Sequence, residues 1–302
     1  MSQIITTGAN PKALWPGIKA WFGQEYDKHP EEWVDLFDQD TSDKAYEEIV
    51  QSTGFGLPRV KAQTESIDYD TTAQGYTKRF THTTYALGFM VSHEEMVDNQ
   101  YDAVSKRRAP DLAFSMRQGH ETVCAQVYNR ATTSGYTGGD GVVLGSASHP
   151  TMSGNQSNLL TAADLSEASL EDGVIAVMTA LDDRARKINL QVQSLHIHPN
   201  NWFEANRILK SVLSNDNSSN AVNALKITNA IPKGIKMNHY FDDTDAWFLR
   251  TNARNAMIHF QREPLEFGED GVFDNRVMKY AAFERFDASW ADWRGIWVNA
   301  GA

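Results

Sequence analysis

The segment SHEEMVDNQYDAVSKRRAPDLAFSMRQGHETVCAQVYNRAT, residues 92–132, decides the fold of this chain. Ser92 followed by Glu95 is typical of a capping box, which predicts a first helix that ends before Pro110. Pro110 suits the first turn of a second helix, because its missing N–H costs nothing there. Beyond it, apolar residues recur at helical spacing on one face: Leu112, Met116, Val123, Val127 and Ala131. Residues 110–131 would form a rod roughly 33 Å long, on which other segments should pack.

The composition is that of an acidic globular protein. The chain has 302 residues, of which 41% are hydrophobic and 22% are charged, enough for a large core and about two domains. Its net charge of −11 argues against proteins that wrap DNA or bind membrane surfaces, because both need basic patches. No run reaches the ~20 apolar residues of a membrane span, and the N-terminus lacks the pattern of a signal peptide. We expect a soluble protein made in a cytoplasm.

Cys124 is the only cysteine of the chain, and it lies within the predicted rod. A single cysteine cannot form a disulfide inside the chain. We expect a small buried thiol here rather than a nucleophile or a crosslinking site.

The segments ahead of the rod are short apolar-faced pieces without a core of their own. Large apolar side chains gather on one face of residues 11–22, and further short helices are expected around 31–37 and 43–50. Such pieces must dock on another surface. That surface belongs either to their own domain or to a neighbouring subunit.

A long, mostly polar hairpin is expected between these pieces and the rod. Residues 59–69 and 76–91 have the composition of strands, and residues 70–75 form a polar turn between them. A two-stranded hairpin is barely stable alone. It therefore needs a partner surface, inside the molecule or outside it.

The region after the rod predicts an α/β unit followed by strands. A helix capped by Ser169 runs to Ile188, a strand follows at 190–198, and Pro199 separates it from a second helix. Short strands are expected at 235–239, 246–250 and 257–261, and a closing pair, joined by a turn at 287–292, at 277–286 and 293–298. The whole chain is therefore expected to be α+β.

A search for catalytic patterns leaves one weak candidate. His196 and His198 lie two residues apart on a predicted strand, so both side chains should point to one face. A metal would need further ligands that the sequence does not place, and satisfied histidines are the plainer interpretation. The sequence contains no nucleotide-binding loop, nucleophile elbow or metalloprotease motif. We expect no catalytic residue, cofactor or metal.

The order of these elements resembles the major capsid proteins of tailed bacteriophages with the HK97-type fold, most closely the Mu-like major head subunits. Short motifs in the same order carry the resemblance: Leu14-Trp15-Pro16-Gly17-Ile18-Lys19, Glu32-Trp33, Gly141 to Pro150, Leu195-His196-Ile197-His198-Pro199, and Phe286 to Gly295. The resemblance implies an α+β, HK97-type capsid fold. Its parts would be an N-terminal arm (1–53), an extended hairpin loop (54–91), a peripheral domain with a long spine helix (92–158), an axial α/β domain (159–256) and a β return to the peripheral domain (257–302).

The resemblance also implies a structural, non-enzymatic function. Copies would form hexamers and pentamers that close into an icosahedral shell around double-stranded phage DNA. The protein would belong to the virion and assemble in the host bacterial cytoplasm, together with a portal. Because the arm begins close to Met1, the chain resembles members that use a separate scaffolding protein.

Eight side chains are predicted to contact neighbouring subunits: Trp15, Trp21, Phe22, Lys61, Tyr69, Tyr76, Lys78 and Arg117. On the rod, we expect Val123 to face its own sheet and Arg117 to face a neighbour. Some members of the family crosslink Lys to Asn. No local pattern around Lys61 or Lys78 selects such a pair, so crosslinking is not expected.

Two other functions remain open at the level of sequence. An encapsulin-like compartment shares the same fold but encloses cargo enzymes instead of DNA. A metal-dependent hydrolase would use His196 and His198 as ligands.

Overall fold

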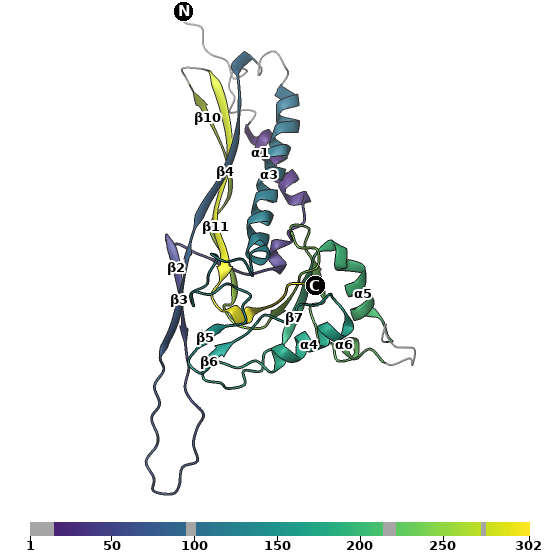
Figure 1. Ribbon diagram of the computed structural model, residues 1–302. Helices are drawn as coiled ribbons and strands as arrows, with labels where there is room; N and C mark the ends of the chain where they lie inside the picture. Colours follow the sequence, from purple (N-terminus) through teal and green to yellow (C-terminus); the bar gives the residue numbers. More distant parts are fainter. Residues whose placement is uncertain (1–14, 95–100, 214–221, 273–275) are drawn as a thin grey trace, which may run out of the picture.

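The computed structural model describes residues 15–94, 101–213, 222–272 and 276–302, and Figure 1 shows its architecture. A long β ribbon runs beside two helices, an α/β body lies at one end, and a narrow loop projects away from both. Residues 1–14 of the expected arm and the capping residue Glu95 lie outside the described residues. Within them, no helix is both long and apolar enough to cross a membrane.

The ribbon is a four-stranded sheet in the order β1-β10-β11-β4. Its strands are β1 (Asp38–Thr41), β4 (Thr83–Val91), β10 (Met257–Val272) and β11 (Val277–Trp290). β11 pairs antiparallel with both β10 and β4. Strands at 257–261 and 277–286 were predicted too short, because β10 continues through the charged and glycine-containing residues 262–272 and β11 continues to Trp290. The expected turn at 287–292 is wrong, since β11 continues through most of it.

One continuous helix, α3 (Tyr101–Asn129), lies along this sheet, beside α1 (Trp15–Lys28). The predicted break at Pro110 is wrong, because Pro110 lies inside α3. Ala109, just before it, and Leu112, two residues after it, are buried in a cluster with Phe22 of α1 and Phe267 of β10. This packing holds the helix together across a residue that disfavours it.

The predicted hairpin has a different register. β2 (Tyr46–Ser52) pairs with β3 (Gln74–Thr81), and residues 53–73 between them form a long loop without strands. The helix expected at 43–50 and the strand expected at 59–69 are therefore wrong. Side chains of β2 alternate between exposed and half-buried, which is the period of a strand. Residues 83–91, expected in the hairpin, instead form the edge strand β4 of the long sheet.

The α/β body is built on a second sheet in the order β12-β9-β7-β8. Its strands are β7 (Val192–Ile197), β8 (Ile235–Met237), β9 (Trp247–Thr251) and β12 (Ile296–Asn299), and its helices are α4 (Glu167–Met178), α5 (Trp202–Lys210) and α6 (Ala224–Ile227). The predicted strand at 190–198 and the helix after Pro199 are confirmed. The strand expected at 293–298 is β12, which pairs with β9.

Helix α4 starts and ends earlier than predicted. Ser166 is its N-cap, and Ser169 stands at the third helical position and completes a capping box. The helix ends at Met178, because the following residues form a turn. There the Asp182 carboxylate accepts hydrogen bonds from the backbone N–H groups of Arg184 and Arg186, both at 2.8 Å.

Short elements complete the fold. They are the turns η3 (Trp33–Asp35), η4 (Pro199–Asn201) and η5 (Trp293–Gly295) and the small hairpin of β5 (His149–Thr151) and β6 (Gly154–Gln156).

Two crossings join consecutive strands of the two sheets, one from β9 to β10 and one from β11 to β12, besides the longer path from β4 through α3 to β7. The crossings lie side by side, since Ala291 N–H donates to the Ala256 carbonyl at 2.8 Å and Thr251 Oγ1 donates to the Arg294 carbonyl at 2.6 Å. Gly295 packs so closely on Ala256 that a Cβ there would overlap it. Arg294 is buried at the joint and pairs with Asp183 at 2.7 Å. The two sheets are thus joined by a doubled, close-packed connection.

Candidate functional site

The loop of residues 53–73 projects away from the rest of its subunit (Figure 1), and most of its residues are exposed. Large apolar side chains on it are open to solvent: Leu57 is 76%, Val60 99% and Tyr69 92% exposed. Soluble proteins rarely leave such side chains gathered on one exposed segment unless another molecule covers them. This loop is therefore the leading candidate for a contact surface.

The base of the loop is fixed to the α/β body. Asp70 accepts hydrogen bonds from the Gly56 N–H at 2.5 Å and from Arg184 Nη1 at 2.7 Å. Backbone N–H groups of Gly56 and Thr71, and then the Arg184 guanidinium, hold the pKa of Asp70 below its usual range. Arg186 also donates to the Phe55 carbonyl. The base therefore has a defined position, while the tip extends away from the subunit.

The predicted contact residues on the loop and on β3 differ in exposure. Lys61 and Tyr69 are exposed on the loop, and their contact with a neighbour stays a prediction. Tyr76 and Lys78 lie on β3 and are occupied within the subunit. Tyr76 Oη donates to the Pro150 carbonyl at 2.6 Å, and Lys78 Nζ lies 4.9 Å above the Trp290 ring. Burial lowers the pKa of Lys78.

The predicted contact residues on α1 and α3 lie close to the subunit's own core. Trp15 and Trp21 fall within α1, but their side chains are outside the described part of the structure. Phe22 is buried and stacks on Phe267 with ring centroids 4.7 Å apart. Arg117 is also buried in its own subunit, and its contact with a neighbour stays a prediction. Both side chains are used inside the subunit.

The buried face of α3 is more polar than its apolar stripe predicted. Arg117 pairs with Glu31 at 2.7 Å and lies 3.7 Å above the Tyr26 ring. Glu121 is fully buried, and its carboxylate accepts hydrogen bonds from the backbone N–H groups of Glu32 and Trp33 at 3.0 and 2.9 Å. These contacts hold residues 31–33 on the helix of their own subunit.

The apolar stripe predicted on α3 differs from the buried face of the helix at two positions. Val123 and Val127 are only half-buried, although Leu112, Met116 and Ala131 are buried as expected. Cys124, Ala125 and Tyr128 take the central position on the buried face. Val123 therefore lies beside the core rather than in it.

His196 and His198, the two metal ligands considered from the sequence, make different contacts in the structure. His196 is buried, and its Nε2 lies 2.8 Å from Ser194 Oγ. Burial, with the positive charge of Arg250, lowers the pKa of His196 to about 3. His198 instead caps the turn η4, since its Nδ1 accepts from the Asn200 N–H at 3.1 Å. In the described ranges, neither histidine belongs to a group of three possible ligands.

Comparisons with known proteins agree on one kind of relative. Residues 75–299 match a family described as "Phage capsid protein". The fold is similar to the capsid of a native GTA particle, with a TM-score of 0.59, 10% identity and 91% of each chain covered. It is also similar to a structure from Mycobacterium phage Patience, with a TM-score of 0.56, 10% identity, and 99% of this chain and 90% of that chain covered.

A third similar structure is a virus-like particle from Pyrococcus furiosus. Its TM-score is 0.51 at 10% identity, and 95% of this chain and 99% of that chain are covered. No curated protein matches this chain by sequence.

Proposed function

This chain belongs to the phage capsid protein family, and we propose that it is a major capsid subunit whose copies form the hexamers and pentamers of an icosahedral shell around double-stranded DNA. A shell-forming, structural role follows from the family. The oligomers and the DNA content are our inference, as is the assignment of the fold to a Mu-like subtype. The parts of an HK97-type subunit can be matched to α3 as the spine, to the α/β body as the axial domain and to residues 53–73 as the tip of the extended loop.

The exposed loop of residues 53–73 carries this proposal. A ring of identical subunits needs a contact in which one surface of each copy meets a different surface of the next. The loop offers such a surface, because Leu57, Val60 and Tyr69 project beyond the subunit and its base is held by Asp70 and Arg184. We expect a neighbour to cover these three side chains.

The remaining partners follow from the same proposal. The protein would reside in the virion capsid and assemble in the host bacterial cytoplasm with a separate scaffolding protein and a portal. The net charge of −11 fits a shell that holds DNA without binding it tightly, since like charges repel weakly at physiological salt.

The decisive experiment shortens the loop without touching the strands. Gly56 and Asp70 are in hydrogen-bond contact, so residues 57–69 can be replaced by two glycines that join these positions. β2 and β3 remain intact, whereas a deletion reaching residue 84 would remove the buried Phe80 of β3. We expect the circular dichroism spectrum and cooperative unfolding of the natural chain, but no closed particles by negative-stain microscopy and light scattering.

A matched control keeps the loop and changes only its polar residues. The double variant Gln63→Ala and Ser66→Ala should assemble normally. If the shortened chain forms particles at the natural yield, the loop is not the assembly surface. If it fails to fold, the loop is part of the core. The absorbance ratio at 260 and 280 nm then separates a shell filled with DNA from a compartment filled with protein.

A further inference from the structure

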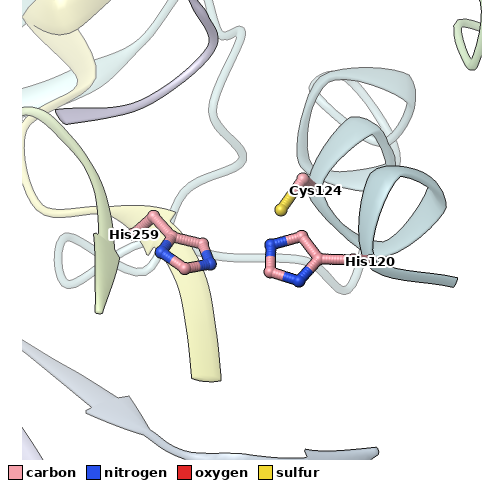
Figure 2. A group of neighbouring side chains, drawn as sticks. All are labelled: His120, Cys124 and His259. Carbon is pink, nitrogen blue, oxygen red and sulfur yellow. The ribbon is translucent and has the colours of Figure 1, made fainter. Parts of the chain in front are cut away.

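Three side chains of the kinds that bind transition metals meet in the core between α3 and β10 (Figure 2). His120 and Cys124 are four residues apart on α3, so they lie one above the other on the same helical face. His259 reaches them from β10. One ligand atom from each residue lies within 4.8 Å of the others, and all three residues are buried.

The two imidazoles of this cluster are incompletely hydrogen-bonded. The Nε2 atoms of His120 and His259 are buried, and neither has a hydrogen-bond partner among the described residues. A buried polar atom without a partner is unfavourable, because it has lost its hydrogen bonds to water. A group bound between these two nitrogen atoms would therefore stabilise the core.

The other ring nitrogen of His120 is already oriented. His120 Nδ1 lies 3.0 Å from Glu284 Oε2, and Glu284 is itself buried. A carboxylate on one imidazole nitrogen fixes the ring and raises the basicity of the other, which is the usual support for a histidine that binds a metal.

Aromatic rings hold both imidazoles in place. Phe286 stacks on His120 and His259 with ring centroids 4.1 and 5.1 Å away, and Trp33 lies 4.8 and 4.2 Å from the same two rings. The ligand side chains are therefore preorganised by packing rather than free to rotate.

We propose that His120, Cys124 and His259 bind a zinc ion that stabilises the subunit. Nitrogen and sulfur donors match the preference of Zn²⁺, which three protein ligands and one water molecule satisfy in a tetrahedral arrangement. On binding, the Cys124 thiol releases its proton to solvent and a sulfur–zinc bond forms. The thiolate and the Glu284 carboxylate then offset the two positive charges of the ion.

The site would fasten the helix to the sheet. It joins α3 to β10 directly and to β11 through Glu284, underneath Trp33 of the N-terminal segment. The inference concerns the stability of the subunit and does not depend on the shell that we propose for it.

The first test uses the unaltered full-length chain. After chelation and dialysis under a non-thiol reductant, we expect it to take up about one Zn²⁺ per chain by elemental analysis, with a rise in the unfolding temperature. With Co²⁺ we expect a sulfur-to-cobalt charge-transfer band. Because Cys124 is the only cysteine, that band can arise only from this site.

Variants assign the ligands. Cys124→Ala should lose the charge-transfer band, and His259→Gln should lose the bound ion. Glu284→Gln should retain the site with an affinity about 10- to 100-fold lower. His239→Gln is the matched control, since His239 is exposed and lies outside the cluster, and it should bind as the natural chain does.

Two results would contradict the proposed zinc site. If the natural chain shows neither the cobalt band nor a thermal shift with Zn²⁺, the cluster holds no metal and a water molecule fills it. If the cobalt band persists at equal strength in His120→Gln and His259→Gln, the thiol binds the ion without these ligands. The natural chain alone decides the first point, so a variant that fails to fold does not hide the answer.

Discussion

The buried face of α3 and the loop of residues 53–73 differ in whether their side chains find partners within the subunit. On α3, charged and polar side chains are buried, and Arg117 and Glu121 each have partners on the N-terminal segment. On the loop, Val60 and Tyr69 are apolar side chains that stand in solvent. One region is complete within a single copy, whereas the other has surface left over for a second molecule.

This difference separates stability from association. Changes on the buried face should lower the free energy of unfolding of each subunit. Changes at the tip of the loop should leave that free energy almost unchanged and act on assembly. Matched substitutions in the two regions test whether stability and assembly can be changed separately.

The largest effect is expected from a new charge in the core. Ala125→Asp places a carboxylate at a fully buried position of α3 and should lower the free energy of unfolding by about 5 kcal/mol, or prevent folding. Val60→Asp, at a fully exposed position, should change it by less than about 0.5 kcal/mol and reduce particle yield. Denaturant titration of unassembled subunits measures both. Equal losses of stability would abolish the distinction.

A charge reversal at the ion pair of α3 should come next. Arg117→Glu removes the partner of Glu31 and adds a like charge near it, so we expect a loss of about 3–5 kcal/mol in the same titration. Arg59→Glu is the control on the loop. Its ion pair with Asp68 is exposed, and the change should stay within about 1 kcal/mol. A stable Arg117→Glu subunit with defective assembly would support the expectation that Arg117 faces a neighbour.

Acid should lower the free energy of unfolding of the α/β body through His196. Burial lowers its pKa to about 3, so below pH 6.5 the unfolded chain binds a proton that the folded chain does not. Stability present above pH 6.5 is therefore lost as the pH falls, by about 2 kcal/mol at pH 5. Unfolding titrations at pH 7 and pH 5 should show a smaller loss in His196→Gln.

The loop supplies the control for this pH dependence. Residues 53–73 contain no histidine, so the shortened chain should lose as much stability between pH 7 and pH 5 as the natural one. An unchanged loss in His196→Gln would show that another group governs the acid response.

The smallest effect is expected at the base of the loop. Arg184→Ala removes a partly exposed ion pair with Asp70 and should cost less than about 1 kcal/mol of stability. Hydrogen exchange at the amides of Gly56 and Thr71, which donate to Asp70, should nevertheless become faster. Arg207→Ala, which breaks the exposed pair with Glu204 on α5, is the control and should leave these amides unchanged.

Much of the α/β body could be predicted from the sequence. Apolar residues around β7 and the breaker Pro199 lie close together in the chain, so local patterns define the strand and the helix after it. The alternation along β2 was missed because Ile49 is the one apolar residue among its half-buried side chains, and its partner strand β3 begins after the whole loop.

The polar face of α3 could not be predicted from the helix alone. Arg117, His120 and Glu121 look like solvent-exposed residues, because their partners lie far away along the chain, at Glu31, Glu284 and Trp33. Only the four-residue spacing of His120 and Cys124 was visible in the sequence, and it is the signal that points to the metal-ligand cluster. The third ligand, His259, comes from a strand that the sequence placed but did not align with the helix.

The double crossing between the two sheets has a mechanical consequence. A single connection would let the α/β body swivel about one pivot. Two connections, joined by the hydrogen bond between Ala291 and Ala256 and packed closely at Gly295, should resist such a rotation. A twisting load on the body is therefore transmitted into β10 and β11. We therefore expect such a load to bend that ribbon before it opens the joint.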